Sequence, residues 1–255
     1  MDTSHTISEL RSALAPLRDG RTIGLVPTMG ALHDGHAALF GAARHECDVV
    51  VASVFLNAAQ FADPADLRAY PRDLDRDAAY AAEHGVDHLF APPPEELYPR
   101  GFATWVVPEG AAEGLEGASR PGHFRGVATV CVKLFNIVRP HRAYFGRKDA
   151  QQVAVVKQVV RDLDLELEIA VVPTVRDRDG LALSSRNARL SPDERRRALA
   201  IPRALATRDV ERARAVLAEA GIEPEYVAVA DLDGPTLAVA ARIGATRLID
   251  NVQLA

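Results

Sequence analysis

The sequence predicts an α/β fold, in which a doubly wound parallel sheet is followed by a smaller α+β C-terminal domain. Strand and helix patterns alternate from Thr6 to Val172. Residues 48–56 form a continuous run rich in β-branched side chains, which is typical of a strand buried on both faces. From Ser191 onward Arg, Ala and Glu dominate the composition. This change indicates that a second domain lies in the C-terminal part of the chain.

The first elements are predicted from capping and periodicity. Thr6 and Glu9 form a capping box that opens a helix, and Gly20 marks its end. The apolar face of this helix consists of Leu10, Leu14 and Leu17. The elements expected next are a strand at 22–26, a helix from Ala37, the strand at 48–56, a helix at 73–84 and a short strand at 86–90.

The middle of the chain repeats the alternation. A helix over residues 124–138 is predicted from apolar residues at helical spacing, namely Val127, Val130, Cys131, Leu134, Phe135 and Val138. A strand at 143–145, a helix at 148–162 and a strand at 165–172 follow. In a sheet of this βαβα order, ligands are expected beyond the carboxyl ends of the strands, at the topological switch point.

The C-terminal region is expected to mix helices with two strands. Ser191 is a good N-cap and Pro192 suits the first helical turn. The two strands are expected at residues 226–230 and 246–251. We therefore predict one domain over residues 1–173 and a second over 174–255, with a hinge at 173–176.

Composition limits the classes of partner. The 255 residues are 48% hydrophobic and 25% charged, with a net charge of −5, which argues against nucleic acid or an anionic membrane as the main partner. The N-terminus lacks the basic and apolar regions of a signal peptide. Two cysteines do not make a disulfide framework. We therefore expect a cytoplasmic protein. We expect no metal site, because the histidines outside the motifs lack partners at metal-ligand spacing, namely His5, His45, His84, His88 and His141.

Residues 27–36, PTMGALHDGH, are the most informative motif. A strand that leads directly into a helix presents unpaired N–H groups and the positive end of the helix dipole, which suit a phosphate. His33 and His36 can lie on one side of the first helical turn, and Gly30 and Gly35 let a ligand approach the backbone. The motif alone is equally compatible with a strand-to-helix connection that carries surface histidines.

Three other segments follow predicted strands. Residues 145–149, FGRKD, supply Lys148 at a helix start, and residues 179–187, DGLALSSRN, contain two hydroxyls and an arginine suited to phosphate. Residues 53–61 carry Asn57 and Gln60, whose amides can orient a small polar substrate. Taken singly, residues 145–149 are compatible with a polar turn and the SSRN part of residues 179–187 with a helix cap. Residues 53–61 are equally compatible with a structural turn. Four such segments at strand ends favour a single ligand site.

Together these segments resemble the pantothenate synthetase (pantoate–β-alanine ligase) family. The resemblance extends from Pro27 to Asn187, and it rests on PTMGALHDGH, SVFLNAAQF, YPRDLDRD, PGHFRGVATVCVKLFNIVRPHRAYFGRKDAQQ and DGLALSSRN, with RLIDN at residues 247–251 as a further match. It implies a Rossmann-like nucleotidyltransferase domain with a small C-terminal lid domain, and a homodimer. It also implies a place in pantothenate biosynthesis, on the route to coenzyme A.

The reaction implied by the resemblance has two steps. The carboxylate of (R)-pantoate attacks the α-phosphorus of ATP to give pantoyl adenylate and pyrophosphate, and the amine of β-alanine then displaces AMP to give pantothenate. Mg²⁺ would be carried on the triphosphate rather than in a protein cage. Catalysis would then consist mainly of positioning and charge stabilisation.

The resemblance also assigns residues. The implied catalytic residues are His33, His36 and Lys148. The implied ATP-binding residues are Met29, Gly30, Ala31, Leu32, His33, Asp34, Gly35, His36, Gly146, Arg147, Lys148, Asp149, Val175, Leu183, Ser184, Ser185 and Arg186. Asp149 would face the ribose, Val175 would contact the adenine, and residues 183–186 would close over the triphosphate. The implied pantoate-binding residues are Asn57, Gln60 and Gln152, and Gln60 would also contact β-alanine.

Two positions depart from the family pattern. Ala58 stands where the family usually has proline, so the loop loses a fixed φ. Leu183 stands where methionine is common, a change that conserves volume. Two other features stay open: His123 can face substrate or be structural, and residues 70–72 can lie at a dimer contact or near the site.

Two other classes of protein share parts of the pattern. A nucleotidyltransferase that stops after attaching a nucleotide would use the same HxGH motif but needs no pocket for an acceptor amine. A non-catalytic nucleotide-binding module would keep the glycines and would not need His36. Conversion of ATP to AMP, measured with and without pantoate and β-alanine, distinguishes all three.

Overall fold

The computed structural model describes residues 1–254, and the chain divides into two compact units. Unit 1 consists of residues 1–145 and 155–172, and unit 2 consists of residues 146–154 and 173–255. Within the described range, none of the helices combines the length and the apolar character needed to cross a membrane.

Unit 1 is built on a parallel sheet of six strands in the order β1-β4-β3-β2-β5-β6. The strands are β1 (Asp2–Ser4), β2 (Ile23–Thr28), β3 (Val49–Val54), β4 (His88–Phe90), β5 (Arg142–Gly146) and β6 (Glu168–Val172). In the centre, Leu25 of β2 pairs with Val51 of β3 and Ala143 of β5. The strand order reverses between β2 and β5, which is the switch point where such sheets bind ligands.

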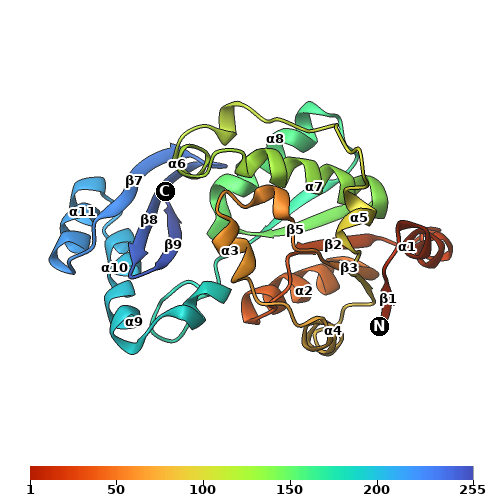
Figure 1. Ribbon diagram of the computed structural model, residues 1–255, viewed down its shortest axis with the longest axis horizontal. Helices are drawn as coiled ribbons and strands as arrows, with labels where there is room; N and C mark the ends of the chain where they lie inside the picture. Colours follow the sequence, from red (N-terminus) through yellow and green to blue (C-terminus); the bar gives the residue numbers. More distant parts are fainter. Residues whose placement is uncertain (255) are drawn as a thin grey trace. The chain divides into compact units, whose positions relative to one another are not determined.

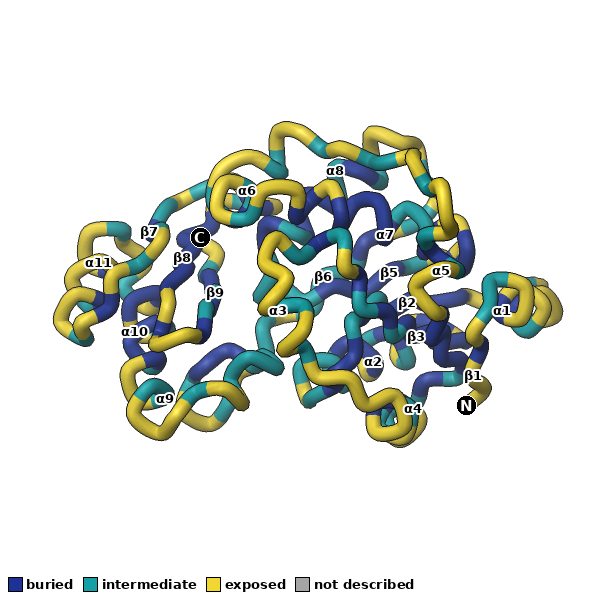
Figure 2. Tube along the Cα trace, in the orientation of Figure 1, coloured by how far each residue is buried: buried dark blue, intermediate teal, exposed yellow. Residues whose placement is uncertain are grey.

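Helices cover both faces of this sheet (Figure 1). The helices are α1 (Ile7–Leu14), α2 (Asp34–Glu46), α3 (Pro64–Arg68), α4 (Leu74–Glu83), α5 (Pro94–Leu97), α6 (Leu115–Ser119), α7 (His123–Val138) and α8 (Ala150–Asp162), with short 3₁₀ turns η1 (Ala15–Leu17), η2 (Ala58–Gln60) and η3 (Gly110–Ala112). Phe40 of α2 and Ala81 of α4 pack with Val50 and Leu89 of the sheet in one core. The central strands are accordingly buried along their length (Figure 2), as the β-branched run at 48–56 predicts.

Unit 2 pairs three helices with an antiparallel sheet. Its elements are η4 (Arg147–Asp149), η5 (Ser185–Arg189), α9 (Pro192–Ala198), α10 (Ala200–Ala206), α11 (Val210–Glu219), β7 (Pro224–Asp231), β8 (Pro235–Ile243) and β9 (Thr246–Gln253). The sheet order is β7-β8-β9. Ile201 of α10, Leu217 of α11 and Leu237 of β8 share its core.

The predicted fold class is confirmed, whereas several element boundaries differ from the prediction. Strand β8 was not expected, because PTLAVAARI is rich in alanine, which has a weak strand preference, and lacks polar alternation. The strand forms because it is central and almost entirely buried. Helix α2 begins at Asp34 rather than Ala37, since His33 is its N-cap. The short edge strand β1 was also missed.

Candidate active site

The loop after β2 makes a left-handed turn at two consecutive residues. Gly30 has φ +84° and Ala31 has φ +53°. A Cβ atom on Gly30 would lie 2.7 Å from Oδ2 of Asp77, so both the backbone angle and the packing require glycine here. The glycine of the sequence motif therefore serves the shape of the loop.

Asp77 of α4 holds this loop from inside unit 1. The side chain is only 2% exposed. Its Oδ2 accepts the Ala31 N–H and its Oδ1 accepts the Leu32 N–H, both at 2.8 Å. Tyr70 adds a hydrogen bond from its hydroxyl to the Gly30 carbonyl at 3.2 Å. Both residues come from YPRDLDRD, so of the two positions considered for residues 70–72, the structure places Tyr70 beside the first motif.

The two histidines cap helix α2 reciprocally. Nδ1 of His33 accepts the Gly35 N–H at 3.1 Å, and Nδ1 of His36 accepts the His33 N–H at 3.2 Å. Their ring centroids are 4.3 Å apart. Because each Nδ1 is an acceptor, the proton of each neutral ring resides on Nε2. Several backbone N–H groups of the motif thus serve its own fold, and the Nε2–H group of each neutral ring is a hydrogen-bond donor.

Asp34, the first residue of α2, is held by Tyr80. The Tyr80 hydroxyl donates to Oδ1 of Asp34 at 2.8 Å. Burial, together with this hydrogen bond to a carboxylate, raises the pKa of Tyr80 to about 12. The hydroxyl therefore remains a donor throughout the neutral pH range.

The neighbouring strand β3 leads into a buried amide pair. Asn57 is 1% exposed, and its Nδ2 donates to Oε1 of Gln60 at 2.9 Å and to the Gly126 carbonyl at 3.0 Å. Its Oδ1 is buried without a hydrogen-bond partner among the described residues. A buried amide oxygen that lacks a donor fits a ligand that brings one, such as a hydroxyl. The Asn57 side chain is held by these two hydrogen bonds, although Ala58 rather than proline follows it.

The backbone of Gln60 is fixed by the PGHFRGV segment. Nδ1 of His123, a buried residue, lies 2.9 Å from the Gln60 carbonyl oxygen, and Nη2 of Arg120 donates to the same oxygen at 3.4 Å. A Cβ atom on Gly126 would lie 2.5 Å from the Ala59 carbonyl oxygen, so α7 packs directly on η2. The structure supports the structural interpretation of His123.

In unit 2, the segment after β5 is a single 3₁₀ turn, η4, that leads into α8. Nζ of Lys148 is 3.7 Å from Oδ1 of Asp149. Arg147 turns to the β7–β8 connection, where it pairs with Asp233 at 2.9 Å. Gln152 follows on the first turn of α8 and is half-buried.

The remaining nucleotide segments predicted for unit 2 share one hairpin. The Leu183 N–H donates to the Val175 carbonyl at 2.9 Å, which brings together two positions eight residues apart. Ser184 is the N-cap of η5, since its Oγ accepts the Arg186 N–H at 3.3 Å. The helix-cap interpretation of SSRN is therefore correct for Ser184.

Sequence reasoning assigned no role to the residues that hold these loops. Asp77 contacts Ala31, and Arg120 contacts Gln60. Asp250 contacts Arg176, which follows Val175, and Asn251 contacts Arg147. Asp77 lies in YPRDLDRD and Asn251 in RLIDN, so both residues belong to segments that carry the family resemblance.

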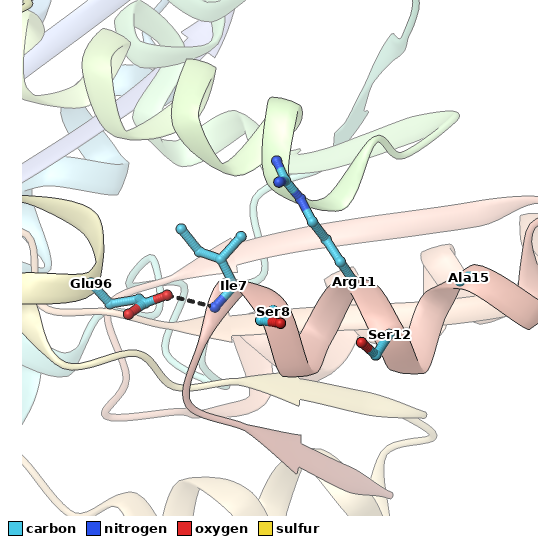
Figure 3. Close-up of a pocket in the computed structure, with 6 residues that line it drawn as sticks. All are labelled: Ile7, Ser8, Arg11, Ser12, Ala15 and Glu96. Atoms are coloured by element: carbon cyan, nitrogen blue, oxygen red, sulfur yellow. Dashed lines mark hydrogen bonds between the residues drawn. The ribbon is translucent and has the colours of Figure 1, made fainter.

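Two other features of the described residues lie apart from these loops. A cleft of about 550 Å³ on α1 is lined by Ile7, Ser8, Arg11, Ser12, Ala15 and Glu96, and it contains none of the predicted ligand-binding residues (Figure 3). Glu96 accepts the Ile7 N–H there at 2.7 Å. Within residues 1–254, no group of three or more His, Cys, Asp or Glu side chains is arranged to hold a metal ion.

Comparisons with known proteins agree across almost the whole chain. A family model described as pantoate–β-alanine ligase matches residues 2–253. The pantothenate synthetase of Moorella thermoacetica is 51% identical, with 100% of this chain and 99% of the relative covered. The pantothenate synthetase of Corynebacterium efficiens is 52% identical, with the same coverage.

Solved structures give the same result. The pantothenate synthetase of Thermus thermophilus superposes with a TM-score of 0.91 at 47% identity, covering 99% of both chains. A pantoate–β-alanine ligase from Francisella tularensis, complexed with β,γ ATP and β-alanine, has a TM-score of 0.90 at 38% identity, covering 99% of this chain and 97% of that one.

Proposed function

Because the chain belongs to the pantoate–β-alanine ligase family, we propose that it condenses (R)-pantoate with β-alanine in an ATP-dependent reaction that forms pantothenate. One observation carries the proposal most directly. The paired strands β2 and β3 end in a histidine cap and a buried amide pair. This arrangement supports a phosphate donor site and a pocket for a small polar acid at one edge of the sheet, as the first step requires.

In the first step, a pantoate carboxylate oxygen bonds to the α-phosphorus of ATP, and the bond from that phosphorus to the pyrophosphate oxygen breaks. Negative charge then grows on the phosphoryl oxygens. The Nε2–H groups of His33 and His36 and the ammonium of Lys148 are the donors that we assign to this charge. The remaining predicted ATP contacts, at 29–36, 146–149, Val175 and 183–186, bind and orient the nucleotide.

In the second step, the β-alanine nitrogen bonds to the pantoyl carbonyl carbon, AMP leaves with the electron pair of the broken C–O bond, and the amine loses a proton. We assign the orientation of pantoate to Asn57, Gln60 and Gln152, and contact with β-alanine to Gln60. The unpartnered Oδ1 of Asn57 supports this assignment, since it can accept a pantoate hydroxyl.

Several finer features belong to the same proposal. Mg²⁺ is carried by the triphosphate oxygens. Residues 1–173 bind nucleotide and pantoate, and residues 174–255 act as a lid domain. The protein is a homodimer, and it acts in the cytoplasm.

The decisive experiment measures the products formed from ATP. With Mg²⁺ and pantoate the purified protein is expected to release pyrophosphate, and addition of β-alanine is expected to yield AMP and pantothenate. Pyrophosphate release that never leads to an amide would favour a nucleotidyltransferase. ATP binding without any turnover would favour a non-catalytic module.

A further inference from the structure

The motif RLIDN, residues 247–251, lies within strand β9 and carries two buried polar residues that the proposed reaction does not use. Asn251 is 5% exposed and Asp250 is 3% exposed. Within the antiparallel pair, Asn251 stands opposite Ala238 and Asp250 opposite Val239 of the central strand β8. Their backbone positions are thus fixed by the sheet of unit 2.

Asn251 binds the carbonyl side of η4. Its Nδ2 donates to the Arg147 carbonyl and to the Lys148 carbonyl, both at 2.9 Å. Its Oδ1 is buried and has no partner among the described residues. The reverse amide orientation would place that oxygen against two carbonyl oxygens, so the orientation with Nδ2 toward η4 is the stable one.

Asp250 binds the hairpin that carries the other nucleotide segments of unit 2. Its two carboxylate oxygens accept Nη1 and Nη2 of Arg176 at 2.6 and 3.0 Å. Nη1 of Arg176 also donates to the Gly180 carbonyl at 3.1 Å. The backbone N–H of Asn251 donates to Oδ1 of Asp250 at 2.8 Å, which couples the two anchors.

We propose that Asp250 and Asn251 are positioning residues, which fix the η4 turn and the hairpin at 175–183 in one geometry for the nucleotide. This inference rests on the proposed function. A turn of three residues has few contacts of its own to hold Lys148, whereas a buried strand is a rigid support. Asn251 also occupies two carbonyl oxygens that would repel a phosphate if they turned toward it.

The central test replaces Asn251 and measures nucleotide binding. Asn251→Ala is expected to weaken ATP binding, measured by calorimetry, and to raise the KM for ATP, each by about ten-fold. The KM for pantoate is expected to change less than about two-fold. Asn251→Asp keeps the shape but sets a carboxylate against two carbonyls, so its effect is expected to be at least as large.

Gln253→Ala is the matched control. Gln253 lies on the same strand and its amide also donates to a backbone carbonyl, that of Asp233 at 3.1 Å, but it contacts neither nucleotide segment. The ATP affinity of the Gln253→Ala variant is expected to match that of the parent protein. Thermal unfolding of every variant is followed in parallel, and Asn251→Ser replaces Asn251→Ala if the latter does not fold.

A double-mutant cycle with Lys148→Ala separates positioning from general stability. If Asn251 acts through Lys148, Asn251→Ala is expected to weaken ATP binding less than about two-fold in the Lys148→Ala background. The inference would be overturned if Asn251→Ala weakened ATP binding by the same factor in the parent and in the Lys148→Ala background. It would also be overturned if Asn251→Ala bound ATP as tightly as Gln253→Ala. If the parent protein does not release pyrophosphate from ATP and pantoate, the proposed function is rejected instead. The ATP affinities of Asn251→Ala and Gln253→Ala would still test whether Asn251 positions η4.

Discussion

The loops at 29–36 and 146–149 are anchored through opposite sides of their peptide groups. Asp77 accepts N–H groups of the first loop, whereas Asn251 donates to carbonyl groups of the second. In the first loop these backbone donors serve the fold, and Nδ1 of His33 and of His36 each accept a further backbone N–H. In the second loop the anchor occupies the carbonyl oxygens of Arg147 and Lys148. The comparison teaches that a buried side chain from a distant element can fix a loop through either side of its peptide groups.

The largest effect is expected where a donor to the phosphates is removed. His36→Ala should lower kcat on the order of 10²–10³-fold with ATP binding less affected. His36→Asn is the matched control, because its side-chain oxygen can occupy the place of Nδ1 and accept the His33 N–H, while it lacks the Nε2 donor. Both variants should be equally slow in steady-state turnover. Activity of His36→Asn near that of the parent would show that His36 only caps the helix.

A smaller loss is expected when the first anchor is removed. Asp77→Ala leaves two buried N–H groups without an acceptor, which should lower the free energy of unfolding by about 3 kcal/mol. It should also lower kcat/KM by about 10–100-fold, because the histidines lose their support. Denaturant unfolding and steady-state kinetics measure both. Asp75→Ala, an exposed position on the same helix, should leave both unchanged, and a similar loss there would refute a specific role for Asp77.

The amide residues should affect pantoate rather than nucleotide. Gln60→Ala and Gln152→Ala strip hydrogen bonds from a small polar acid and should raise the KM for pantoate about ten-fold. The KM for ATP should remain within about two-fold of the parent. Weakened ATP binding in calorimetry, with unchanged pantoate dependence, would mean that these glutamines do not form the pantoate pocket.

Hydrogen exchange can sharpen the comparison between the two units. The amides of Ala31 and Leu32 are already bonded to a buried carboxylate, so they should exchange slowly with or without ATP. Residues 174–191 should exchange about ten-fold more slowly when ATP is bound, if the lid proposal holds. Equal exchange in the two states would mean that the hairpin is preformed and that ATP does not order it.

The sequence was informative wherever a local signal had a local cause. The capping box at Thr6 and Glu9 and the Ser191 N-cap both form as expected. The loop anchors are different, because Asp77 and Asn251 act on residues 45 or more positions away. Both residues lie in segments that match the family, but the neighbouring sequence does not show which distant loop each one contacts. The alanine-rich strand β8 was missed for a related reason, since burial between two partner strands overrode its weak intrinsic preference.

The smallest effect is expected at Ala58, where the resemblance to the family leads us to expect proline. Asn57 has φ −77° and ψ 94°, which a following proline tolerates, and Ala58 is the first residue of η2, where the fixed φ of proline suits a helical start. Ala58→Pro should therefore raise the free energy of unfolding by about 0.4–1 kcal/mol, through the unfolded chain. The KM for pantoate should change less than about two-fold, since two hydrogen bonds already hold the Asn57 amide. Thermal unfolding and a pantoate titration check both values. A large gain in pantoate affinity would show that the amide pair is mobile in the parent. It would also show that the amide pair is held less firmly than the loop at 29–36.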